Sequence, residues 1–191
     1  MKTGFVDDLV KAVEVLRSGG VILYPTDTIW GLGCDATNQA AVKRIYEIKQ
    51  REDSKSMLIL MENPNLLNSY ITEVPEIAWE LIEVADNPLT IIYPGAKNLA
   101  PNLLASDGSV GIRITNEAFS QQLVQRFRKP IVSTSANLTG QKSPHNFAAI
   151  SEEIKKSVDY IVTYRQDDFS KSNPSSIIKL GVGGQIEIVR K

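Results

Sequence analysis

Cysteine and histidine are almost absent from this chain of 191 residues, which contains one of each. A single cysteine, Cys34, cannot close a disulfide within the chain, and one cysteine with one histidine excludes the usual Cys/His zinc clusters. A chain without internal disulfides suits a reducing compartment, so we expect a cytoplasmic protein. A Ser-His-Asp or Cys-His catalytic unit would depend on His145, which lies between Pro144 and Asn146 with no nucleophile motif beside it. We therefore expect His145 to be a surface residue.

Long apolar runs and an excess of charge of one sign are also missing. The longest apolar run is residues 57–61, far below the roughly 20 residues of a membrane-spanning helix. Asp7, Asp8 and Lys11 interrupt any signal-peptide core. Lysine and arginine number 21 against 22 aspartate and glutamate, a net charge of −1, so no overall positive field attracts nucleic acid or anionic membrane. We expect neither secretion nor membrane insertion, and any anion-binding site must be local.

Length and composition indicate an ordinary globular protein. Domains have roughly 150 residues, so residues 1–191 are predicted to form one domain. Hydrophobic residues make up 42% of the chain. A chain of this length buries roughly 70% of its unfolded surface, so it needs neither a disulfide nor a structural metal to hold a core.

The hydrophobic pattern predicts alternating helices and strands. Apolar residues at helical spacing predict a first helix over residues 6–16, closed by Gly19 and Gly20, and a second helix that begins at the N-cap Asn38. Gly31-Leu32-Gly33 lacks the third glycine of a dinucleotide-binding fingerprint, and a turn explains it equally well.

Further elements follow along the whole chain. Apolar or β-branched runs bounded by turn residues predict strands at residues 21–24, 57–61, 89–93, 110–114, 130–133, 159–163, 175–180 and 185–189. Helices fit between them at residues 64–70, 75–85, 116–127 and 146–158. This alternation predicts an α/β or α+β domain with helices on the faces of a sheet.

Three cations follow the second predicted helix, at Lys49, Arg51 and Lys55. Lys49 alone is explained by the favourable position of a cation at a helix C-terminus, worth about 0.3–1 kcal/mol. However, all three precede the apolar strand at residues 57–61 and could converge on one edge of the sheet. Arginine and lysine clustered there suit phosphate or carboxylate recognition.

A polar cluster, STSANLTG, occupies residues 133–140 directly after the apolar pair Ile131 and Val132. Its hydroxyl and backbone N–H groups would emerge at a strand end, where anions often bind. Taken alone, a turn whose hydroxyls bond their own backbone is the better explanation. Arg113 interrupts the apolar strand at residues 110–114, and alternation places it opposite Ile112 and Ile114, so it either meets solvent or lines a cleft.

Four motifs together resemble the YrdC-like threonylcarbamoyl-AMP synthases. In chain order they are PTDTIWGLG at residues 25–33, KQR at 49–51 with Lys55, STSANLTG at 133–140 and PSSII at 174–178. Each motif is modest, but the ordered set is specific. The resemblance extends from Asp7 to Val189 and is to the short, single-domain form of the family.

The resemblance implies a twisted, open mixed sheet with helices on its faces and a concave cationic cavity. The implied enzyme is a nucleotidyltransferase that converts L-threonine, bicarbonate and ATP, with Mg²⁺, into threonylcarbamoyl-AMP and pyrophosphate. A separate transferase complex would pass the threonylcarbamoyl group to a tRNA adenosine beside the anticodon, and direct tRNA binding would be weak at most. Two alternatives stay open: a YciO-like paralogue with the same scaffold, and a non-catalytic RNA-binding module.

The resemblance also assigns roles to individual residues. Lys49, Arg51 and Lys55 correspond to the catalytic cations. Thr26 and Arg113 correspond to substrate-binding positions, and Thr115 and Thr90 are further candidates placed by adjacency alone. The positions implied to bind the nucleotide are Arg51, Lys55, Ser133, Ser135, Asn137 and Ser175. No protein-bound metal cluster is expected, because Mg²⁺ would accompany ATP.

Overall fold

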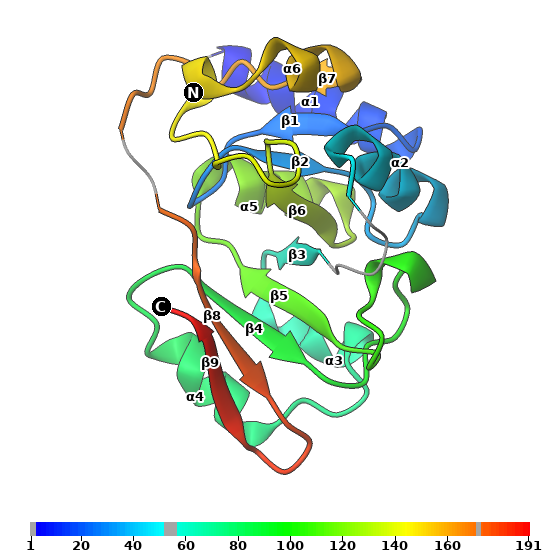
Figure 1. The fold of residues 1–191 in the computed structure, drawn as a ribbon, viewed down its shortest axis with the longest axis vertical. Helices are drawn as coiled ribbons and strands as arrows, with labels where there is room; N and C mark the ends of the chain where they lie inside the picture. Colours follow the sequence, from blue (N-terminus) through cyan, green and yellow to red (C-terminus); the bar gives the residue numbers. More distant parts are fainter. Residues whose placement is uncertain (1–2, 52–56, 171–172) are drawn as a thin grey trace.

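The computed structural model describes residues 3–51, 57–170 and 173–191, which form a sheet flanked by helices (Figure 1). The strands are β1 (Ile22–Tyr24), β2 (Gly31–Gly33), β3 (Leu58–Met61), β4 (Leu89–Tyr93), β5 (Val110–Ile114), β6 (Ile131–Ser135), β7 (Tyr160–Ile161), β8 (Ser176–Leu180) and β9 (Ile186–Arg190). The α-helices are α1 (Thr3–Arg17), α2 (Gln39–Lys49), α3 (Leu67–Tyr70), α4 (Glu76–Glu83), α5 (Ala118–Phe127) and α6 (Glu152–Ser157). Short 3-10 helices are η1 (Pro64–Leu66), η2 (Pro101–Leu103) and η3 (Phe147–Ala149).

The sheet is mixed, as expected. Its strand order is β7-β1-β2-β6-β3-β5-β4-β8-β9. The pairs β1 with β7, β3 with β5 and β4 with β8 are parallel, and the remaining neighbours are antiparallel. Strands far apart in the chain therefore lie side by side. Strands and the loops that flank them bring residues 28, 51, 113, 133, 175 and 190 around one cleft.

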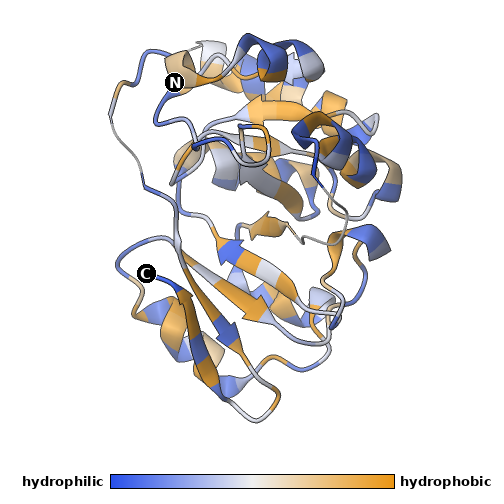
Figure 2. Ribbon diagram, viewed as in Figure 1, coloured by the Kyte–Doolittle hydropathy of each residue, from blue (hydrophilic) through white to orange (hydrophobic). Residues whose placement is uncertain are grey.

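Strand alternation sorts apolar side chains to two cores on opposite faces of the sheet. Ile22 of β1 packs in one cluster with Leu16 of α1 and Phe119 of α5. The next residue, Leu23, belongs to a larger cluster with Ile45 of α2. Figure 2 shows how hydrophobic residues gather in strands such as β1 and β3. Successive side chains of one strand thus pack on opposite faces of the sheet. The same alternation determines which side chains reach the candidate site.

The strands β4, β5 and β8 are covered by helices on one face. In Figure 1, α3 and α4 lie behind these strands, and Ile91 and Ile112 share the larger core with Leu67 and Ala78 of those helices. Among the described residues, no helix covers the other face of β4 and β5. This open face is where polar and cationic side chains collect.

Two predicted elements differ from the structure. Gly31-Leu32-Gly33 is the strand β2 rather than a turn, and glycine is required there because a Cβ on Gly33 would lie 2.6 Å from Cε1 of Tyr24. The helix predicted over residues 146–158 is broken into η3 and α6. Ile150 is extended, and Ser151 caps a new helix by accepting a hydrogen bond from the Ile154 amide.

Other expectations hold. Asn38 caps α2 by accepting hydrogen bonds from the amides of Ala40 and Ala41, and Cys34 is a fully buried small residue whose thiol pKa is raised by burial. None of the helices in the described ranges has the length and apolar character that a bilayer crossing requires.

Candidate active site

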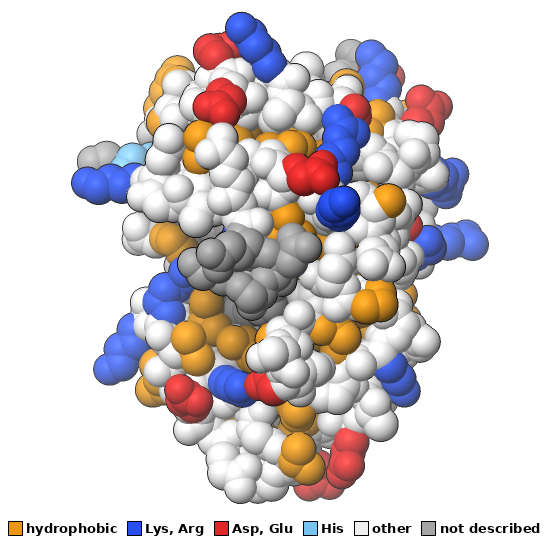
Figure 3. Space-filling model, turned by 45° about the vertical axis from the view of Figure 1, so that its right-hand side comes forward, with side chains coloured by type: hydrophobic (Ala, Val, Ile, Leu, Met, Phe, Trp, Pro, Cys, Tyr) orange, Lys and Arg blue, Asp and Glu red, His pale blue; other side chains and the backbone are white. Residues whose placement is uncertain are grey.

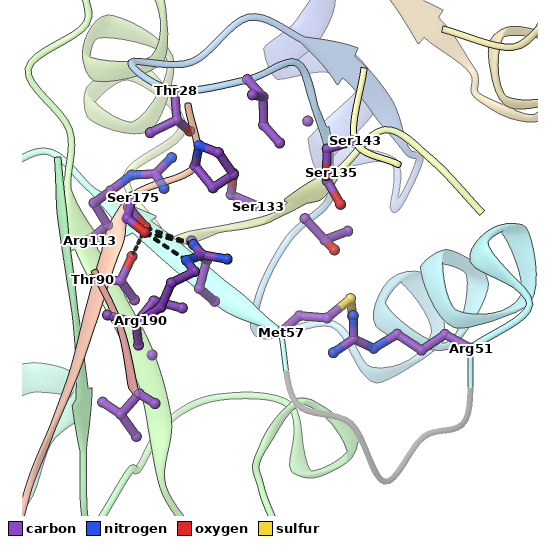
Figure 4. Close-up of a pocket in the computed structure, with 18 residues that line it drawn as sticks. Thr28, Arg51, Met57, Thr90, Arg113, Ser133, Ser135, Ser143, Ser175 and Arg190 are labelled. Atoms are coloured by element: carbon purple, nitrogen blue, oxygen red, sulfur yellow. Dashed lines mark hydrogen bonds between the residues drawn. The ribbon is translucent and has the colours of Figure 1, made fainter. Parts of the chain in front are cut away.

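A cleft of about 260 Å³ opens on the uncovered face of β4 and β5. The loop between β1 and β2, the end of β6 and the segment that enters β8 form its other walls (Figure 4). Its lining includes three cations, Arg51, Arg113 and Arg190, and no aspartate or glutamate among the described residues. By contrast, charges of both signs are interspersed over the outer face in Figure 3. The cleft is therefore suited to anions.

Arg113 is the most deeply placed of the three arginines. It is 3% exposed, and its Nη2 lies 3.0 Å from Oδ1 of Asp27. Burial raises the pKa of Asp27, and the charge of Arg113 only partly offsets that effect. The Nε of Arg113 is buried without a hydrogen-bond partner in the described part of the chain. Of the two expectations for Arg113, the cleft-lining one is confirmed.

Arg190, at the end of β9, is a cleft residue that the sequence did not reveal. Its Nε and Nη2 donate to the carbonyl oxygen of Ser175 at 2.9 and 2.7 Å. The Ser175 hydroxyl in turn lies 2.8 Å from the hydroxyl of Thr90 (Figure 4). Burial and the neighbouring charge of Arg113 lower the pKa of Arg190. The sequence did predict a strand at residues 185–189, which places Arg190 at a strand end, but it did not indicate which residue Arg190 contacts.

Arg51 reaches the cleft because of how α2 ends. Gln50 adopts a left-handed conformation with φ of 49°, and its amide donates back to the carbonyls of Glu47 and Tyr46. The chain then turns so that Arg51 lies half-buried at the opposite wall from Arg113 and Arg190 (Figure 4). Burial lowers the pKa of the Arg51 guanidinium.

Lys49 lies outside the cleft lining and supports the cleft wall instead. The side chain is 2% exposed, and its ammonium donates to the carbonyl oxygens of Ser135 and, at 2.7 Å, Asn137. Burial, reinforced by the charge of Arg51, lowers the pKa of Lys49 to about 8. Lys49 is the last residue of α2, as expected for a cation at a helix C-terminus, and its ammonium also ties the end of α2 to the loop after β6. Lys55 lies outside the described residues.

Three further predicted residues make local hydrogen bonds and lie outside the cleft lining. The hydroxyl of Thr26 donates to the Ile29 carbonyl at 2.8 Å, and Thr28 lines the cleft in its place. The Thr115 hydroxyl lies 2.8 Å from that of Ser120 at the start of α5. Asn137 donates to the carbonyls of Leu138 and Gln141. Their predicted contacts with substrate or nucleotide stay predictions.

Hydroxyl groups complete the cleft. The members that the sequence predicted are Ser133, Ser135, Ser175 and Thr90, and Thr28, Thr134 and Ser143 join them. The turn after β6 bonds its own backbone, for example from the Gln141 amide to the Leu138 carbonyl, and Lys49 binds two more of its carbonyl groups. Guanidinium groups beside a ring of hydroxyls can bind phosphate and carboxylate oxygens together.

Relatives of the chain carry informative names. The family model for Sua5, YciO and YrdC, described as "Telomere recombination", matches residues 14–191. The threonylcarbamoyl-AMP synthase of Pseudoalteromonas translucida is 33% identical over 93% of this chain and 95% of its own. A "Putative threonylcarbamoyl-AMP synthase" of Methanocaldococcus jannaschii is 34% identical over 89% of this chain and 81% of its own.

Solved structures agree with the fold. P. abyssi Sua5 complexed with L-threonine superposes with a TM-score of 0.82 at 25% identity, covering 92% of this chain and 51% of that one. The present chain thus spans about half the length of that Sua5. E. coli YciO gives a TM-score of 0.83 at 28% identity, covering 96% of this chain and 88% of its own. The chain belongs to the Sua5/YciO/YrdC family.

Proposed function

We propose that the chain is a threonylcarbamoyl-AMP synthase, which joins L-threonine, bicarbonate and ATP into threonylcarbamoyl-AMP and releases pyrophosphate. One observation carries the proposal: three arginines and a set of hydroxyls converge on one cleft whose described lining has no carboxylate. The names of the curated relatives and the threonine bound by a Sua5 of the same fold support it.

The chemistry needs positive charge more than a protein nucleophile. The threonine amine adds to bicarbonate, and water leaves to give an N-carboxylate. One oxygen of this carboxylate bonds to the α-phosphorus of ATP as the bond from that phosphorus to the bridging oxygen of pyrophosphate breaks. Two anions must approach, so preorganised guanidinium groups in a partly dry cleft lower the barrier. An exposed His145, outside the cleft lining, has no place in this step.

Mg²⁺ is proposed to enter with ATP. The described cleft lining offers hydroxyl oxygens but no carboxylate, and no cluster of three metal-ligating His, Cys, Asp or Glu side chains occurs within the described residues. This donor set does not suit a resident divalent ion, which prefers carboxylate and carbonyl oxygens. Phosphate oxygens of the nucleotide would supply the missing ligands.

The product sets the proposed partners. Threonylcarbamoyl-AMP is an activated adenylate, so a transferase that acts on tRNA must consume it. A net charge of −1 argues that this chain itself binds tRNA weakly at most.

The test is an omission assay on the purified protein. Pyrophosphate release and the adenylate mass are measured with L-threonine, bicarbonate, ATP and Mg²⁺, and then with each left out. The proposal predicts that both signals need all of them. ATP cleavage that is indifferent to threonine contradicts it. No turnover in any mixture favours the YciO-like alternative, and steeply salt-dependent RNA binding without turnover favours the RNA-binding module.

A further inference from the structure

A second and larger cavity lies on the opposite face of the same two strands. It has a volume of about 580 Å³. Whereas Thr90 and Arg113 face the cleft, their neighbours Ile91 and Ile112 line this second space, because successive side chains of a strand point to opposite faces. We call it the back cavity. It lies between β4, β5, the end of α4 and the start of α5.

The floor of the back cavity is apolar. Ile91, Tyr93 and Ile112 are at most 2% exposed, and Leu89, Ile114 and Ile82 of α4 are partly exposed around them. A concave apolar surface of this volume falls in the range of small-molecule sites, about 300–1,000 Å³. The floor can therefore hold the hydrocarbon body of a ligand.

The rim of the back cavity carries charge opposite to that of the cleft. Asp27, Asp86 and Glu117 line it, together with the amides of Asn87 and Asn116, and no lysine or arginine occurs among its described lining residues. Asp86 is exposed at the mouth. Two of these carboxylates already face arginines outside the lining, Asp27 beside Arg113 and Glu117 beside Arg165. Asp86 has no ion pair among the described residues, so its charge is the one that attracts a cation and disfavours an anion.

The carboxylates differ in how far they are already engaged. Glu117 caps α5, with one oxygen accepting from the Ser120 amide at 2.7 Å and the other 3.7 Å from Arg165. Asp27 is 13% exposed, and its Oδ1 is buried 3.0 Å from Arg113 but makes no hydrogen bond within the described chain. Asp86, exposed at the mouth, is therefore the carboxylate best placed to accept from a ligand.

We propose that the back cavity is a second binding site, which takes a small organic cation: a primary ammonium group on an apolar body. The ammonium donates up to three hydrogen bonds to the carboxylate and amide oxygens of the rim, and the body covers the isoleucine floor. A neutral ligand of the same shape would desolvate the carboxylates without replacing their lost hydration. The inference is independent of the proposed function, because it rests on the other face of the sheet.

The probe is hexylamine, titrated into the full chain and followed by calorimetry. Hexan-1-ol has the same body without charge, hexanoate reverses the charge, and methylamine lacks the body. We expect saturable binding of hexylamine at least tenfold tighter than that of hexan-1-ol or methylamine, and none of hexanoate. Equal affinity for amine and alcohol, or no binding of the amine, overturns the proposal.

Substitutions locate the site without touching the cleft. Ala85→Trp fills the exposed mouth of the back cavity and should abolish hexylamine binding. Its matched control is Val84→Trp, at a 70% exposed position outside the lining, which should leave binding unchanged. Asp86→Asn should weaken binding at least threefold, and Glu83→Gln, at the exposed end of α4 and outside the lining, should not. Unchanged binding in a folded Ala85→Trp variant, checked by its melting temperature, shows that the amine binds elsewhere and refutes the assignment.

Discussion

The cleft and the back cavity are built from the same two strands and have opposite electrostatic character. Residues of β4 and β5 alternate between them, so that Arg113 faces the cleft and Ile112 faces the back cavity. Arginines line one cavity and carboxylates line the other, within a chain whose net charge is −1. A near-zero net charge therefore excludes a strong overall field but not local concentrations of charge, because arginines and carboxylates gather at different cavities.

The two cavities meet at one ion pair. Asp27 lines the back cavity and Arg113 lines the cleft, with 3.0 Å between Asp27 Oδ1 and Arg113 Nη2. Both side chains are largely removed from water, so each depends on the other for compensation of its charge. Changes at this pair should have the largest consequences.

Arg113→Met tests that dependence and carries the largest expected effect. Turnover should fall by roughly 10³-fold, the upper scale for losing one preorganised charge-stabilising group. The free energy of unfolding should fall by about 3 kcal/mol, because Asp27 loses its compensating charge. Urea unfolding and pyrophosphate release measure both quantities. The double variant Asp27→Asn with Arg113→Met should regain most of the stability and none of the activity. An Arg113→Met protein as stable as the parent contradicts this account of the pair.

Arg51→Ala tests the cleft without changing a residue of the back cavity. Turnover should fall by roughly 10²-fold because one cation that faces the reacting anions is lost. The free energy of unfolding should change by less than about 1 kcal/mol, since Arg51 lies in a loop after α2. Lys43→Ala, at an exposed lysine on α2, is the matched control and should keep turnover within twofold. A collapse of the melting temperature in Arg51→Ala would make Arg51 structural.

Raising the pH should weaken the positive field of the cleft through Lys49, whose pKa is lowered to about 8. As Lys49 loses its proton, the dissociation constant for ATP should rise about fivefold between pH 7 and 9.5, the scale of about 1 kcal/mol for a nearby charge. Lys49→Arg keeps its charge and should remove this pH dependence. An identical pH profile in the parent and in a folded Lys49→Arg protein contradicts the assignment.

The stability of the protein should show the opposite trend in the same pH range. Between about pH 8 and the unfolded value near 10.4, the unfolded chain binds more protons at Lys49 than the folded chain does. The free energy of unfolding should therefore rise with pH there, by at most about 1.4 kcal/mol per pH unit. Subtracting the profile of Lys49→Met isolates this slope.

His145→Ala carries the smallest expected effect. His145 is exposed and lies outside the lining of both cavities. Turnover should stay within twofold of the parent at every pH. A loss of turnover of tenfold or more would show that His145 takes part in the reaction, and would contradict the claim that the functional residues are those lining the cleft.

The fold was largely predictable because its strands are short apolar runs between turn residues. The strands at residues 89–93 and 110–114 have the predicted bounds. The strand β2 was missed because glycine has little preference for strands. The glycine at position 33 is explained by tertiary packing, since a Cβ there would meet Tyr24, Ile131 and Val132. The prediction of one helix over residues 146–158 was wrong because the chain is extended at Ile150, and Ser151 then caps a separate helix, α6.

The site was predictable where strand alternation or motif position determined it. Alternation gave the face of Arg113 but left open whether it met solvent or lined a cleft. The motif resemblance indicated Ser133 and Ser135, which their place at a strand end alone did not decide. Arg190 could not be predicted, because its role depends on the pairing of β9 with β8. The inward turn of Lys49 likewise depends on carbonyl groups about ninety residues away, at Ser135 and Asn137.

The most direct test of the central claim is a structure of the protein with ATP and L-threonine bound. The account predicts that the phosphate groups lie in the cleft, within hydrogen-bond distance of Arg51, Arg113 or Arg190, with threonine beside them. Phosphate groups bound on the outer surface, or in the back cavity beside Asp27 and Glu117, would contradict it.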